Sequence, residues 1–209
     1  MKLKEPILII GAHVDDGEFG CGGTIARLVE DAHSVAYAVL SPAIQSLQDG
    51  MPSDTTEKEM HSASALLGLK WEDCRLYDFP VRLFPFHRQP ILELLVELQK
   101  EIRPGTVIMP CQYDTHQDHH TIFEEGFRAF KRSATILGYE MPDNMRTFSS
   151  AAFVVLQDRH FQVKQKAVNA YKSQKWRGHG AHLRSLAQLR GAQVGAKYAE
   201  AFEVIQWII

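Results

Sequence analysis

The chain has 209 residues, of which 45% are hydrophobic and 23% charged, and its 23 Lys and Arg residues nearly balance 25 Asp and Glu residues. This composition predicts one globular domain over residues 1–209 and excludes a disordered chain or a fibre. The net charge of −2 argues against a nucleic-acid partner, which usually needs a basic excess. No apolar run approaches the roughly 20 residues that span a bilayer, and the N-terminus does not resemble a signal peptide. We therefore expect a cytoplasmic protein without a membrane partner.

Short β-rich apolar runs alternate with segments of helical periodicity along the chain. We expect strands at residues 6–11, 34–40, 75–78, 106–110, 136–140, 151–156 and 201–209. We expect helices from a cap at Thr24 onward and at residues 56–67, 90–102, 119–132, 159–172 and 182–193. This alternation predicts a Rossmann-like, doubly wound α/β fold with a mostly parallel sheet and helices on both faces.

Two polar clusters each follow directly after a predicted strand. The first, at residues 13–18, contains His13, Asp15, Asp16 and Glu18. The second, at residues 114–120, contains Asp114, His116, Asp118, His119 and His120. Because sites in such folds gather at the carboxyl ends of the strands, we expect the two clusters to share one crevice, although about 100 residues separate them.

Together the clusters offer two histidines and one carboxylate to a single metal ion. Such a set leaves coordination positions open, which is typical of a catalytic metal rather than a structural one. Zinc fits these ligands, and another divalent metal such as Fe²⁺ uses the same types, so the residues leave the metal open. Each cluster alone also fits a simpler interpretation: a solvated turn at Asp15 and Asp16, and a polar helix start at residues 116–120.

Glycines at Gly20, Gly22 and Gly23 lie between a strand and a helix, as in a nucleotide-binding loop. Their spacing is not GxGxxG, and no GxxxxGK[ST] motif occurs in the chain. We expect no organic cofactor, and we interpret these glycines as positions where other groups pass close to the backbone.

The string AHVDDGEFGCGGTIARL resembles the first motif of the PIG-L/LmbE-like zinc-dependent N-acetylglucosaminyl deacetylases, and DTHQDH resembles their second motif, HxDH. Later strings, ILGYEMP, KAVNAYKSQ and GAKYAEAFEVI, resemble family members that act on sugars. The resemblance implies that His13, Asp16 and His119 bind zinc and that Asp15 is the general base. It also implies that His116 stabilises the transition state and that Asp118 orients and charges His116.

The chain departs from the family pattern at three places. Val14 replaces a common proline, and residues 56–59 read Thr-Glu-Lys-Glu where many relatives have an arginine near the start of a helix. Tyr171 stands where many relatives have the histidine of HxSQ, which indicates a subgroup with a different substrate.

The resemblance implies hydrolysis of an N-acetyl group on an amino sugar, in a glycoside, a sugar nucleotide or a natural-product precursor. Zinc would acidify the attacking water, and protonated His116 would bind the oxyanion. The alternatives are a metal-dependent amidase or esterase acting on a non-sugar substrate, and a non-catalytic metal- or sugar-binding module. Tyr113, Trp176 and Phe86 are candidates for stacking on a sugar ring, and a loop with His179 and His182 is a candidate for closing over it. The sequence leaves the oligomeric state open.

Overall fold

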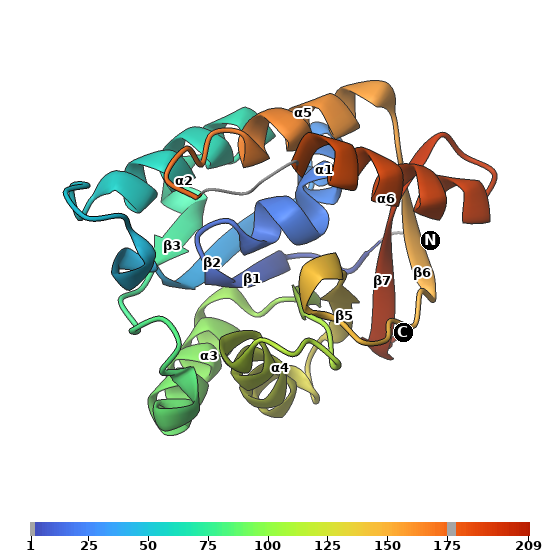
Figure 1. Ribbon diagram of the computed structural model, residues 1–209. Coiled ribbons are helices and arrows are strands. Elements are labelled where there is room, and N and C mark those ends of the chain that lie inside the picture. Colours follow the sequence, from blue (N-terminus) through green and yellow to red (C-terminus); the bar gives the residue numbers. More distant parts are fainter. Residues whose placement is uncertain (1–2, 175–178) are drawn as a thin grey trace.

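A seven-stranded mixed sheet with the strand order β3-β2-β1-β4-β5-β7-β6 organises the computed structural model, which describes residues 3–174 and 179–209 (Figure 1). Strands β1 to β5 are parallel, and β7 runs antiparallel to both β5 and β6. The strands are β1 (Ile7–His13), β2 (Val35–Ser41), β3 (Cys74–Leu76), β4 (Thr106–Pro110), β5 (Thr135–Tyr139), β6 (Ala152–Leu156) and β7 (Tyr198–Gln206).

Helices cover both faces of this sheet. Figure 1 shows α1, α2 and α5 on one face, with α6 beside α5, and α3 and α4 on the other face. The helices are α1 (Asp16–Glu30), α2 (Thr55–Leu67), α3 (Arg88–Ile102), α4 (Gln117–Phe130), α5 (Asp158–Val168) and α6 (His179–Gln193). Short 3₁₀ helices lie at Ile44–Ser46, Trp71–Asp73, Phe84–Phe86 and Pro142–Asn144.

The continuous apolar run of β1 is explained by burial on both of its faces. Ile7 and Ile9 pack into the hydrophobic cluster beneath α1 and α2, whereas Leu8 and Ile10 pack into the cluster beneath α3 and α4. A parallel strand at the centre of a sheet buries successive side chains on opposite faces, so alternation with polar residues is lost. The predicted doubly wound α/β fold is therefore confirmed.

The largest error in the predicted elements is the start of α1. The helix begins at Asp16, eight residues before the predicted cap at Thr24, and it is kinked at Cys21, whose backbone is non-helical. At the kink, the buried carboxylate of Glu200 on β7 accepts the backbone N–H groups of Gly23 (3.0 Å) and Thr24 (2.6 Å). A distant side chain thus satisfies backbone donors that the kink exposes, which the local sequence does not indicate.

The structure also differs from the sequence-based prediction near the C-terminal end. Residues from His179 onward belong to α6 rather than to a loop, and the exposed His182 ring lies 3.9 Å from Asp143. Trp176 lies outside the described residues. None of the helices in the described part of the chain combines the length and apolarity needed to cross a bilayer.

Candidate metal centre and active site

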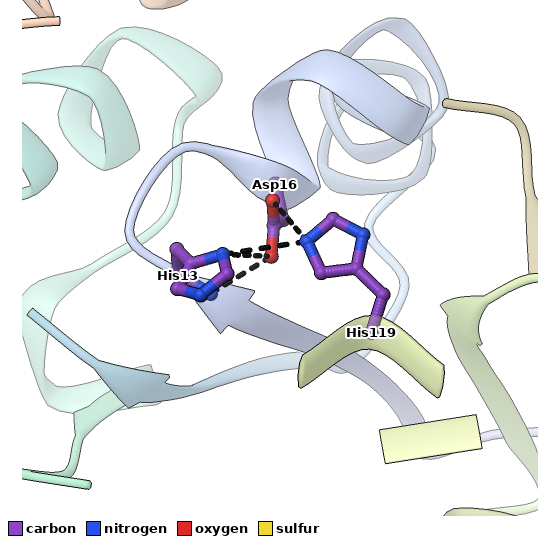
Figure 2. Close-up of side chains that lie close together, drawn as sticks. All are labelled: His13, Asp16 and His119. Atoms are coloured by element: carbon purple, nitrogen blue, oxygen red, sulfur yellow. Dashed lines mark hydrogen bonds and ion pairs between the residues drawn. The ribbon is translucent and has the colours of Figure 1, made fainter. Parts of the chain in front are cut away.

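The two polar clusters meet at the carboxyl ends of β1 and β4 (Figure 2). His13 is the last residue of β1, Asp16 opens α1, and His119 lies in the first turn of α4. His119 Nε2 lies 3.3 Å from His13 Nδ1 and 3.2 Å from Asp16 Oδ1, and His13 Nδ1 lies 3.5 Å from Asp16 Oδ2. All three residues are buried or nearly so. One ligand atom from each therefore faces a common point, as a metal site requires.

In each of the two histidines, the ring nitrogen that points away from Asp16 contacts a buried carboxylate. His13 Nε2 lies 3.0 Å from Asp118 Oδ2, and His119 Nδ1 lies 2.7 Å from Asp114 Oδ2. A carboxylate accepts a proton donor, so these contacts place the ring protons on the outer nitrogens and leave the inner lone pairs facing Asp16. Histidines that bind metal ions have this arrangement, with a carboxylate fixing tautomer and orientation. The residues therefore fit a divalent metal ion.

The electrostatics of this group favour positive charge. Burial lowers the pKa of both histidines, but the attraction of Asp16 and the outer carboxylates outweighs it, raising the pKa of His13 to about 9 and that of His119 to about 10. Burial raises the pKa of Asp16, yet the two histidines hold it well below its usual range. The carboxylates therefore favour a positive charge between the rings, and a dication that replaced the inner ring protons would supply that charge.

Asp118 differs from its predicted role. Its carboxylate contacts His13, and it also accepts the backbone N–H groups of Arg82 (2.5 Å) and Phe84 (3.2 Å). Burial raises the pKa of Asp118, but the His13 bond and these backbone donors lower it overall. The sequence-based assignment of this carboxylate to His116 is corrected: Asp118 contacts His116 through its backbone N–H, which donates to His116 Nδ1 at 3.2 Å.

His116 caps α4 beside the metal group, with ring centroids 5.0 Å from His13 and 4.7 Å from His119. Because Nδ1 accepts the Asp118 N–H, the ring proton belongs on Nε2. Burial lowers the pKa of His116, as do the neighbouring rings of His119 and His13. The charges of Asp118 and Asp16 oppose this shift of the His116 pKa, but its net direction is towards the neutral ring, whereas the family resemblance implies a protonated one.

His13, His116 and Asp118 form a second group with metal-ligand spacing. Its carboxylate is already occupied, because both Asp118 oxygens accept backbone N–H groups and Oδ2 also binds His13. In the first group, Asp16 Oδ2 accepts the backbone N–H of His13 (2.8 Å), whereas Oδ1 faces His119 Nε2 (3.2 Å). The group of His13, Asp16 and His119 therefore fits a metal ion better than the second group does.

Asp15 is buried at the N-cap of α1, next to Asp16 but outside both groups of potential ligands. Its charge contributes to the raised pKa of Glu18 and of Tyr171, in which burial is the largest cause. Glu18 is fully buried, and this burial raises its pKa to about 8 against the opposing hydrogen bonds of Tyr37 and Tyr171.

Two residues around the site, Asp114 and Glu59, had no role assigned to them from the sequence. Asp114 accepts the backbone N–H of His116 (2.8 Å) and also binds His119. Its position two residues before His116 and five before His119 could have indicated this role from the sequence. Glu59, in the stretch that lacks the expected arginine, binds Ser173. No local pattern indicated this long-range contact.

The remaining candidates lie outside the metal group. His120 is exposed, and Phe86 and Tyr113 are exposed aromatic side chains, 83% and 51% accessible. Their accessibility suits contact with a ligand, and stacking on a sugar stays a prediction. Cys21 and Cys111 are buried free thiols, and the pKa of each is raised by burial.

Fold and site together define an α/β protein with a histidine–carboxylate centre suited to a divalent metal. The profile of the PIG-L family, described as GlcNAc-PI de-N-acetylase, matches residues 8–130. The diacetylchitobiose deacetylase of Thermococcus kodakarensis is 30% identical, over 99% of this chain and 88% of that protein. The chain belongs to the PIG-L family.

Solved structures have the same fold. The conserved protein TT1542 from Thermus thermophilus has a TM-score of 0.79 at 26% identity, covering 97% of this chain and 95% of that one. The N,N'-diacetylchitobiose deacetylase from Pyrococcus horikoshii has a TM-score of 0.77 at 23% identity (95% and 83% coverage). GalB, a 4-carboxy-2-hydroxymuconate hydratase from Pseudomonas putida, has a TM-score of 0.75 at 17% identity (97% of each chain). Because the hydratase shares the fold, the fold alone does not decide the reaction.

Proposed function

We propose that this protein is a zinc-dependent N-deacetylase that removes the acetyl group from an N-acetylated amino sugar. The observation that carries the proposal is the paired carboxylate–histidine arrangement: Asp118 fixes His13 and Asp114 fixes His119, so that both inner nitrogens face Asp16. Membership of the PIG-L family and the likeness to a diacetylchitobiose deacetylase support an amino-sugar amide as the substrate.

His13, Asp16 and His119 would hold the zinc ion. When bound, zinc supplies a Lewis acid that acidifies water and polarises an amide carbonyl. Histidine and carboxylate ligands suit zinc, and Fe²⁺ accepts the same donors, so the metal itself is part of the test.

Asp15 accepts the proton of the attacking water. Asp15 is buried next to Asp16, is not one of the ligand residues, and matches the base of the family's first motif. The water oxygen forms a bond to the acetyl carbon, and the carbon–nitrogen bond then breaks. Asp15 returns the proton to the leaving amine, so that acetate and a free amino sugar are the products.

His116 donates from Nε2 to the oxygen of the acetyl group as negative charge develops on it. The Asp118 backbone N–H holds Nδ1, so this orientation is set before the substrate arrives. A donor placed in this way contributes about 3–4 kcal/mol to transition-state stabilisation. The donor is a neutral imidazole, because its neighbours lower the pKa of the ring.

The first experiment combines metal analysis with an acetate-release assay. Purified protein is freed of metal, reconstituted with Zn²⁺ or Fe²⁺, and assayed on N-acetylglucosamine, diacetylchitobiose and non-sugar N-acetyl amides. We expect zinc-dependent acetate release from the sugars. Release only from non-sugar amides or esters would favour the alternative hydrolase, and zinc binding without any hydrolysis would favour a binding module.

Two adjacent substitutions test the residue roles. Asp15→Asn should keep zinc and lower kcat by about 10²–10⁴-fold, because it removes the base and not a ligand. Asp16→Asn should lose zinc, because it removes a buried ligand. Zinc lost from Asp15→Asn and kept by Asp16→Asn would reverse the two assignments.

A further inference from the structure

The loop that joins β1 to α1 is bound by the hydroxyl group of Tyr171. Tyr171 lies 157 positions after Val14, the loop residue that it contacts. This hydroxyl contacts the backbone carbonyl of Val14 in a short hydrogen bond and lies 2.9 Å from Glu18 Oε1. Tyr171 and Glu18 are buried. The tyrosine therefore binds the peptide group immediately before Asp15 and the side chain three residues after it.

Tyr37 holds the other end of the same loop. Its hydroxyl accepts the backbone N–H of Gly17 (3.1 Å) and donates to Glu18 Oε2 (2.9 Å). Glycine is needed at position 17, because an added Cβ would lie 2.7 Å from the Tyr37 hydroxyl oxygen. Asp15 and Asp16 are thus enclosed between two fixed points, the Val14 carbonyl and the Gly17 N–H.

The segment that carries Tyr171 is itself anchored to α2. Ser173 donates both its backbone N–H (2.8 Å) and its hydroxyl (2.5 Å) to the carboxylate of Glu59. Ser173 is buried, and Glu59 is partly buried. The position of the Tyr171 ring is therefore set by two groups of polar contacts. Its hydroxyl binds the loop, and Ser173, two residues later, binds Glu59.

We propose that Tyr171 is a positioning residue for Asp15 in the reaction, an inference that rests on the proposed deacetylase function. The Val14 carbonyl and the Asp15 N–H belong to one peptide plane, so a hydrogen bond to that carbonyl fixes the plane and with it the Asp15 Cα that carries the side chain. Misplacement of a reacting group by about 1 Å costs about 10²-fold in rate. The three metal-binding side chains have their own contacts and do not depend on the Tyr171 hydroxyl.

The test compares two tyrosine-to-phenylalanine substitutions in the zinc-loaded protein. Tyr171→Phe removes the hydroxyl that binds Val14 and Glu18 and leaves only the longer contact of the Tyr37 hydroxyl with the Val14 carbonyl (3.5 Å). We expect kcat to fall by at least about tenfold while KM and zinc stoichiometry stay unchanged. Tyr139→Phe is the matched control: its hydroxyl is also buried and also donates to a backbone carbonyl, that of Ile10 within β1 (3.2 Å). The control should lower the melting temperature to a similar extent and leave kcat unchanged.

Glu59 provides a second variant with its own rescue. Glu59→Ala releases Ser173 and should lower kcat in the same direction as Tyr171→Phe. Glu59→Gln keeps an acceptor oxygen and should restore most of the loss. A structural role alone would lower the melting temperature of all these variants without separating their kcat values.

The outcomes distinguish this inference from the function on which it rests. If the unmodified protein releases acetate and Tyr171→Phe keeps its kcat, the inference is overturned and the deacetylase function stands. Loss of zinc from Tyr171→Phe, or an equal loss of kcat in Tyr139→Phe, overturns it as well. If the unmodified zinc-loaded protein releases no acetate from any substrate, both proposals fail together.

Discussion

The two motifs of the site are supported in opposite ways. Residues 13–18 are held by side chains from other segments, Tyr37 and Tyr171, and Glu200 holds the kink of α1 just beyond them. Residues 114–120 largely hold themselves, because Asp114 and the Asp118 backbone orient both histidines of the same motif. The first motif should therefore be sensitive to changes elsewhere in the fold, whereas the second should be sensitive to changes within its own seven residues.

The largest effect is expected from breaking the buried ion pair behind the first motif. Lys164 Nζ lies 2.5 Å from Glu200 Oε1, and both residues are about 95% inaccessible. Lys164→Met leaves the Glu200 charge buried without its partner, which should cost about 3–5 kcal/mol in the free energy of unfolding. Urea unfolding of the metal-free protein measures this difference.

Lys197→Met is the control for that substitution. Lys197 pairs with Asp158 at 2.6 Å, but both side chains are exposed, so water and salt screen the interaction. The control should unfold at nearly the same urea concentration as the unmodified protein. Equal destabilisation of the two variants would contradict the idea that α1 depends on this buried pair.

An intermediate effect is expected inside the second motif. Asp114→Ala removes the outer partner of His119 and the acceptor for the His116 N–H, so zinc affinity should fall by about 10–100-fold. A competition titration with a chelator measures the affinity. Thr115→Val is the matched control, because the Thr115 hydroxyl binds the backbone of Asn144 and not the site. If both variants bind zinc equally well, Asp114 does not support His119.

The same contrast explains what could be predicted from the sequence. The apolar runs at β1 and β4, and the polar residues after them, are local features, so the sheet and the convergence of His13, Asp16 and His119 could be anticipated. The contact of Asp118 with His13 could not, because it depends on how two strand ends pack in space. The pairing of Asp118 with His116 came from the family resemblance.

Support from distant segments was the least predictable part. By the sequence alone, Glu18 could cap the first helix or line the pocket, and the structure buries it fully between two tyrosines from other segments. The start of α1 was misplaced for a related reason. Its glycines suggest a loop, but they lie within the helix. Glycine is needed there because Tyr139, Lys164 and Leu156 pack against the positions where a Cβ would lie.

The smallest effect is expected at the exposed end of α1, where Glu30 binds Arg159 and His160 on α5. Hydrogen bonds from Arg159, and then from His160, lower the pKa of Glu30 from 4.5 to about 2. Because the folded state lowers this pKa, the contribution to stability is present above pH 4.5 and is lost as the pH falls towards 2. Glu30→Gln should therefore reduce stability slightly at pH 6 and should not differ from the unmodified protein near pH 2. Urea unfolding of both proteins at a series of pH values, repeated in 1 M salt, checks this. A difference that persists at low pH or is insensitive to salt would show that this contact acts through packing and not through charge.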